Sequence, residues 1–150
     1  MKLFRRNKKG FTLIELVVVI AIVGILATIV TLSVMAVVRN AKEKAAATAL
    51  TAYWNNTVKS FHQVNRGLST YNEPSEEFLA IRLGLDKGNL IVSESKCTSL
   101  PGTTFIYIQY TDNPKSVYNR YTVKCIWMLR DDQYYYTTDG NTIVGPKSSP

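Results

Sequence analysis

The residue with the clearest chemical signal is Glu15, a carboxylate set in an otherwise apolar run. The 28 positions from 11 to 38 carry no other charged residue. A charge near the middle of a membrane helix costs about 2.5 to 3.5 kcal/mol on insertion scales, so such a residue usually has a specific partner. The alternative interpretation is a surface acid that reaches the membrane interface. Glu15 is therefore the first candidate for a functional residue.

The remaining residues that could do chemistry are few. Cys97 and Cys125 stand outside any CxxC pair and His62 is the only histidine, so the sequence offers no set of metal ligands at the usual spacing. It also contains no Ser/His/Asp or Cys/His motif and no phosphate-cradling glycine loop. Asp131 and Asp132 are typical of a turn. These observations predict a protein that is not an enzyme and uses no metal or cofactor.

The charge distribution predicts how the chain is placed in a membrane. Five basic residues and no acid occur in the first ten positions: Lys2, Arg5, Arg6, Lys8 and Lys9. They supply most of the formal net charge of +7, so the rest of the chain is not strongly basic. Basic residues before an apolar span hold that end in the cytoplasm. The run 11–38 exceeds the roughly 20 residues that cross a bilayer and is too long for the core of a secretory leader. The sequence predicts one span, with residues 39–150 outside the cytoplasm.

The membrane helix is predicted to continue through about residues 39–64. The stretch from 39 to 61 contains no Gly or Pro and is rich in Ala. An apolar stripe recurs there at helical spacing, formed by Leu50, Trp54, Val58 and Phe61. Gly67 is the expected stop signal. We expect this stripe to pack on a sheet.

The C-terminal half predicts a connecting region and then a sheet. Residues 65–102 contain one short helix that begins after Ser75 and a short strand at 90–92. Strand patterns follow over about 103–145, the last of them at 141–144, with turns near 112–116, 130–133 and 139–140. A three- or four-stranded antiparallel meander is the simplest arrangement. The predicted fold class is α+β, a long N-terminal helix packed on a small antiparallel sheet.

Tyrosines are concentrated in and beside the predicted strands. They are Tyr107, Tyr110, Tyr118, Tyr121, Tyr134, Tyr135 and Tyr136. With nearby lysines and arginines, such rings could stack the bases of a nucleic acid. Tyrosine is also a common strand residue with an apolar body. The sequence favours a role in the sheet or in subunit contacts.

Residues 8–27, KKGFTLIELVVVIAIVGILA, resemble the type IV prepilin family. The resemblance rests on a basic leader that ends in Gly10, an aromatic Phe11, the acid Glu15 and a long apolar helix that contains Gly24. It implies that a prepilin peptidase/methyltransferase cuts between Gly10 and Phe11 and methylates the new amino group of Phe11. It also implies a pilin-like fold with a cleaved leader at 1–10, a transmembrane and filament-core helix at 11–38, and an extracytoplasmic globular head at 39–150.

In this family, the acid that corresponds to Glu15 pairs with the amino group of a neighbouring subunit. One charge buried alone in a filament core is strongly unfavourable, so the pair could set the register between subunits. The hypothesis is that Glu15→Ala or Glu15→Val enters the membrane but is not incorporated into a filament. The family often carries a proline at the position of Leu32, so a kink or a melted turn stays open here.

The two cysteines allow a bridge or two free thiols. Both fall in the part predicted to be outside the cytoplasm, where a disulfide can persist. A bridge between Cys97 and Cys125 would tie the connecting region to the sheet and stabilise the head by roughly 3 to 4 kcal/mol in the chain-entropy model.

The resemblance predicts a structural subunit of an extracellular type IV pilus or of a related secretion or competence pseudopilus. The expected partners are the prepilin peptidase/methyltransferase, other pilin subunits, the pilus assembly platform and, before assembly, membrane lipid; nucleic acid is less favoured. The subunit would lie in the inner or cytoplasmic membrane and later in a filament at the cell surface. The alternatives are an anchored extracytoplasmic binding domain that keeps its leader and a competence pilin for DNA uptake. The motif does not separate major pilin, minor pilin and pseudopilin.

Overall fold

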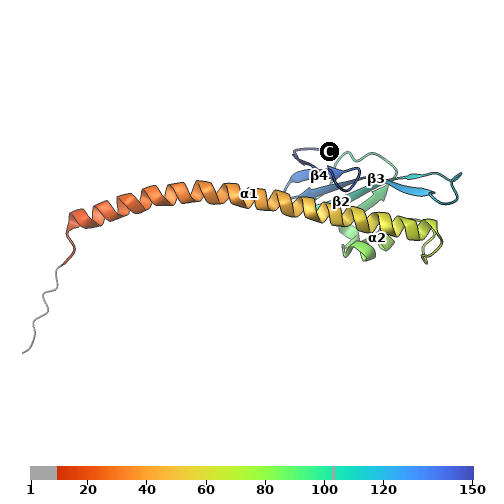
Figure 1. The fold of residues 1–150 in the computed structure, drawn as a ribbon, viewed down its shortest axis with the longest axis horizontal. Helices are drawn as coiled ribbons and strands as arrows, with labels where there is room; N and C mark the ends of the chain where they lie inside the picture. The colour runs from red at the N-terminus through yellow and green to blue at the C-terminus, as the bar shows by residue number, and fades with distance from the viewer. Residues whose placement is uncertain (1–9, 103) are drawn as a thin grey trace, which may run out of the picture. The chain divides into compact units, whose positions relative to one another are not determined.

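The computed structural model describes residues 10–102 and 104–150 (Figure 1). Of the predicted leader, only Gly10 lies within the described residues. The chain divides into a unit that ends at Ala41 and a unit Lys42–Pro150, and each is described by itself. The elements are α1 (Leu13–Asn65), α2 (Glu76–Leu83), the 3₁₀ turn η1 (Lys87–Asn89), β1 (Leu90–Ser93), β2 (Thr104–Asp112), β3 (Tyr121–Arg130), β4 (Gln133–Thr137) and β5 (Val144–Lys147).

The described part of the N-terminal unit contains residues 10–12 and the first part of α1, and its apolar side chains face solvent. Every residue from 10 to 41 whose side chain is described is exposed. Thr28, Thr31 and Ser33 each donate a hydrogen bond to the carbonyl four residues earlier, at 2.9, 2.8 and 3.2 Å. The backbone is helical through position 32, where the family often has proline. By length and composition, α1 could cross a membrane.

The head, as we call Lys42–Pro150, uses the second part of α1 as one layer of its core. The face of α1 that meets the sheet contains Ala46, Leu50, Thr57, Ser60, Phe61 and Val64, all buried. The predicted stripe is confirmed at Leu50 and Phe61, whereas Trp54 and Val58 are half-buried beside it. Thr57 and Ser60 are polar residues on this buried face. Their burial is tolerated because their hydroxyls donate to the carbonyls of the preceding turn, at 2.7 and 2.8 Å.

Helix α1 ends as the sequence predicted. Gly67 has a φ of 65°, which suits glycine. Its N–H donates to Val64 O at 3.0 Å, and Leu68 N–H donates to Gln63 O at 2.9 Å. These two bonds form a Schellman cap that satisfies the last carbonyls of the helix. The short helix α2 is also confirmed, with the Ser75 hydroxyl accepting a bond from Phe78 N–H.

The sheet has five strands in the order β1-β2-β3-β4-β5. The prediction of a wholly antiparallel sheet with three or four strands was wrong, because β1 joins β2 in parallel and β5 adds an edge. The last strand occupies 144–147 rather than 141–144, since residues 139–142 form a hydrogen-bonded turn. The turn at Asp131 and Asp132 is confirmed, and both have positive φ, as a two-residue hairpin turn requires.

The sheet has apolar groups on both faces. The inner face packs on α1 and α2 through side chains that include Ile106, Ile108, Ile126 and Met128. The outer face carries a smaller cluster of Phe105, Tyr107 and Leu129, which Cys97 and Leu100 of the connecting segment 94–102 cover. Parallel neighbours require a crossover connection, so this segment has to pass over one face of the sheet.

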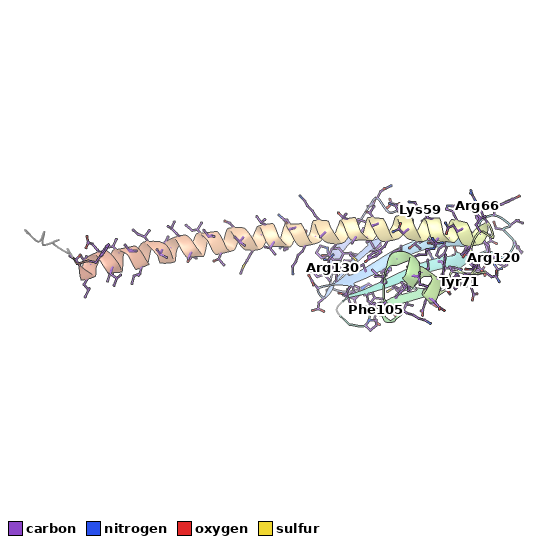
Figure 2. The ribbon with its side chains drawn as sticks, turned by 90° about the horizontal axis from the view of Figure 1, so that it is seen from below. Lys59, Arg66, Tyr71, Phe105, Arg120 and Arg130 are labelled. Carbon is purple, nitrogen blue, oxygen red and sulfur yellow. The ribbon has the colours of Figure 1, made fainter. Side chains whose placement is uncertain are left out.

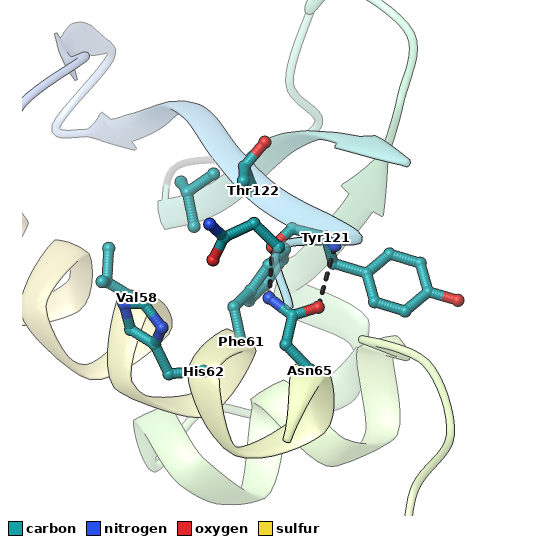
Figure 3. Close-up of a pocket in the computed structure, with 8 residues that line it drawn as sticks. Val58, Phe61, His62, Asn65, Tyr121 and Thr122 are labelled. Atoms are coloured by element: carbon teal, nitrogen blue, oxygen red, sulfur yellow. Dashed lines mark hydrogen bonds between the residues drawn. The ribbon is translucent and has the colours of Figure 1, made fainter. Parts of the chain in front are cut away.

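Asn65, the last residue of α1, joins the helix to the start of β3 (Figure 3). Its side-chain amide donates to Tyr121 O at 2.8 Å and accepts from Tyr121 N–H at 2.9 Å. This pair lies beside a cavity of about 180 Å³ that Phe61 and His62 also line. Figure 3 shows the residues that line this cavity. One side chain therefore satisfies both backbone groups of a residue 56 positions away.

We expect Asn65→Ala to destabilise the head by about 1 to 3 kcal/mol, because it leaves the Tyr121 backbone groups without this partner. The measurement is denaturant unfolding of the full chain in detergent, followed by tryptophan fluorescence; both tryptophans, Trp54 and Trp127, lie in the head. Asn55→Ala is the matched control, because Asn55 is exposed on the same helix. Equal midpoints for the two variants would contradict the proposed role of Asn65.

Candidate functional site

The predicted cleavage position lies immediately before α1. Gly10 and Phe11 precede the helix, which begins at Leu13, and both are exposed. Phe11 retains 85% of its accessible surface, and a Cβ added at Gly10 would meet no atom within 4 Å. The peptide bond between them is thus outside regular structure and open to an approaching enzyme.

Glu15 takes part in a reciprocal cap at the start of α1. Its Oε2 accepts from the backbone N–H of Thr12 and from the Thr12 hydroxyl, both at 2.8 Å. In return, Glu15 N–H donates to Thr12 Oγ1 at 3.3 Å. This is a capping box, in which residues three apart satisfy each other's free backbone groups. The sequence interpretation did not identify Thr12 as a partner, although the Thr-x-x-Glu pattern before an apolar run is its signal.

Phe11 and Glu15 lie on the same side of the helix start. They border one shallow hollow together with Ile14, Val18 and Val19. Among the described residues, no basic side chain forms an ion pair with Glu15. Within the described residues, the carboxylate is held by its hydrogen bonds to Thr12, next to the residue that would carry a new amino group after cleavage.

A scan against protein families matched residues 5–31 to the prokaryotic N-terminal methylation motif. This motif is the type IV pilin and pseudopilin signature. Gly10, Phe11, Thr12 and Glu15 all fall within the matched residues. Searches of curated proteins and of solved structures found no match.

The pilin signature gives the N-terminal unit a functional context. It implies processing by prepilin peptidase and assembly with other pilin subunits. An exposed apolar helix fits membrane anchoring before assembly and burial in a surface filament afterwards. The α+β layout, with α1 packed on a five-stranded mixed sheet, is pilin-like as the sequence predicted.

Most of the tyrosines in and beside the strands are buried or half-buried in the packing of the head. Tyr107, Tyr121 and Tyr135 are buried. Tyr110 packs against Phe61 and Tyr121 at ring-centroid distances of 5.8 and 6.0 Å. Tyr134 and Tyr136 are half-buried, and Tyr118 is exposed. These tyrosines therefore do not form a continuous stacking platform, which supports the structural interpretation.

The described part of the head contains no cluster of three or more His, Cys, Asp or Glu side chains placed to hold a metal ion. His62 is exposed on α1, as expected of a surface imidazole. The cavity beside it, at about 180 Å³, is smaller than the roughly 300 to 1,000 Å³ of typical small-molecule sites.

Cys97 and Cys125 are buried free thiols in the structure, so the predicted bridge is not formed in it. The Cys125 thiol donates instead to Gln109 Oε1 at 3.3 Å. Burial, with a smaller contribution from Cys125, raises the pKa of Cys97 to about 11. Burial also raises the pKa of Cys125. At neutral pH both groups are protonated, and thiols in that state oxidise slowly without a catalyst.

The bridge stays a prediction for the exported protein, in which a thiol oxidase can act. We expect protein that is sheared from the cell surface and unfolded without reductant to react with no alkylating reagent. After reduction, the same protein should react with two equivalents. Native reduced protein should alkylate slowly at neutral pH and faster as the pH rises toward the Cys97 pKa of about 11. Two labels without reductant would contradict the bridge.

Proposed function

We propose that this chain is a structural subunit of a type IV pilus or of a related pseudopilus. Prepilin peptidase cuts between Gly10 and Phe11, the Phe11 amino group is methylated, and the apolar part of α1 then packs against other copies. The observation that carries the proposal is a lone carboxylate, Glu15, beside the cleavage position on an exposed apolar helix.

The proposed role of Glu15 follows from its electrostatics. In the uncut chain, the Thr12 hydrogen bonds satisfy part of the carboxylate without neutralising its charge. Bundling of apolar helices removes water, and a buried charge without a partner costs several kcal/mol. The Phe11 amine of a neighbouring copy supplies the opposite charge. Two oppositely charged groups 4 Å apart attract by about 4 kcal/mol at an effective dielectric constant of 20.

The experiment is mass spectrometry of filaments sheared from the cell surface. We expect a chain that begins at Phe11, carries one methyl group on its amine and is abundant in the sheared fraction. Filaments that lack this chain, in cells that produce it, would contradict the proposal.

The anchored binding domain is the alternative outcome of the same experiment. It predicts that Met1 or the leader is retained and that the protein stays in the membrane fraction. N-terminal sequencing of the membrane-bound protein separates the two. A competence pilin would give the same processed N-terminus, and loss of DNA uptake in a deletion strain would distinguish it.

A further inference from the structure

One end of the head exposes two large apolar side chains on a short loop. The loop 113–120, which we call the tip loop, connects β2 to β3. Val117 and Tyr118 retain 80% and 79% of their accessible surface. Tyrosine is among the residues that contribute most at protein interfaces. An apolar pair presented in this way indicates a contact surface.

The tip loop is held in shape by its own hydrogen bonds. Asn113 N–H donates to Arg120 O at 2.7 Å and Ser116 N–H donates to Asn113 O at 2.9 Å. Arg120 closes the base through two bonds to Asp112, at 3.0 and 3.2 Å. A loop that is already ordered loses little conformational entropy on binding. The exposed pair is thus presented on a preformed support.

A pocket of about 320 Å³ lies at the opposite end of the β2–β3 ladder. We call it the end pocket. Its walls are mostly apolar, from residues that include Ala49, Tyr53, Leu85 and Met128, and Asn89 and Arg130 add polar groups. Figure 2 shows Arg130 and Arg120 at opposite ends of the head. The nine residues of β2 separate these ends by roughly 30 Å, because a strand rises about 3.3 Å per residue.

We propose that the tip loop of one copy inserts Tyr118 into the end pocket of the next copy. The inference rests on the proposed filament function and adds a contact between heads to it. A knob and a hole on different surfaces of one chain make a heterologous contact, which generates a ring when the rotation between copies closes and an open helical filament when it does not.

The chemistry of the two surfaces is complementary. The apolar walls accept the ring of Tyr118, while Asn89 and Arg130 offer its hydroxyl hydrogen-bond partners, which a buried tyrosine usually has.

The test is disulfide trapping in filaments of the full chain. A chain that carries both Tyr118→Cys and Asn89→Cys should give a ladder of covalent oligomers on mild oxidation. Either substitution alone should give none, because the contact places position 118 against position 89 and never against itself. The natural cysteines are buried and are present in every sample.

A second measurement is the filament yield. Tyr118→Ser should lower the amount of sheared filament at least tenfold, and Ala49→Phe, which fills the end pocket, should do the same. Leu68→Ser is the matched control, because Leu68 is 72% exposed outside the tip loop, and it should keep the wild-type yield. Unfolding midpoints of the Tyr118 and Leu68 variants should equal the wild type.

The outcomes separate the two proposals. Wild-type filaments with no ladder from the double variant, or a normal yield from Tyr118→Ser, would overturn the head contact and leave the filament function intact. Failure of the wild-type chain to enter any filament would overturn both.

Discussion

Filaments should be lost in both Glu15→Ala and Glu15→Gln, although only the alanine variant removes the side-chain hydrogen bonds of the capping box. Glutamine can take the place of glutamate in this motif, so Glu15→Gln keeps the helix start and removes only the charge. Leaving one member of a buried ion pair alone costs about 3 to 5 kcal/mol, which corresponds to a loss of a hundredfold or more in association. The measurement is the amount of subunit in the sheared filament fraction, with membrane insertion and leader cleavage followed in the same cells.

Thr12→Val is the complementary variant. It removes the hydroxyl that pairs with Glu15 and keeps the carboxylate, so the local cap weakens by about 1 kcal/mol while the charge pair survives. We expect this variant to assemble far better than either Glu15 variant. Normal filaments from Glu15→Gln would show that Glu15 acts through the cap and not through its charge.

Gly140→Ala should destabilise the head by about 2 to 5 kcal/mol, from backbone strain and a steric clash together. Gly140 is buried with a φ of 77°, and an added Cβ would lie within the indole of Trp54, 2.6 Å from its Cγ. Both backbone polar groups of Gly140 are hydrogen-bonded: its N–H donates to Thr137 Oγ1 at 2.8 Å, and its carbonyl accepts from Thr51 Oγ1 at 3.0 Å. It therefore cannot move away from the helix without losing these bonds.

Denaturant unfolding followed by tryptophan fluorescence measures this effect directly, because Trp54 lies at the contact. Gly84→Ala is the matched control. Gly84 has a φ of 66° and open space around it, so alanine there should cost only the backbone strain of about 1 to 2 kcal/mol. Equal losses for the two variants would mean that the Trp54 contact adds nothing.

The sequence by itself determined the features that depend on residues close together in the chain. The apolar run, the lone Glu15 and the Gly10–Phe11 pair lie within a few turns of one another, so composition and spacing suffice to predict the span and the processing site. The stop at Gly67, the cap at Ser75 and the turn at Asp131 and Asp132 also depend only on neighbouring residues. The capping box belongs to the same class, since its two members are three residues apart.

Only the tertiary structure decided how the head closes. No local signal in the sequence predicts the parallel pairing of β1 or the outer cluster covered by the segment 94–102. The same holds for the burial of Thr57 and for the close approach of Gly140 to Trp54. Each depends on residues far apart in the chain, as in the bonds that span 56 positions from Asn65 and 89 positions from Thr51. Strand order and register are selected by the packing of whole faces against each other, and that selection involves all the elements at once.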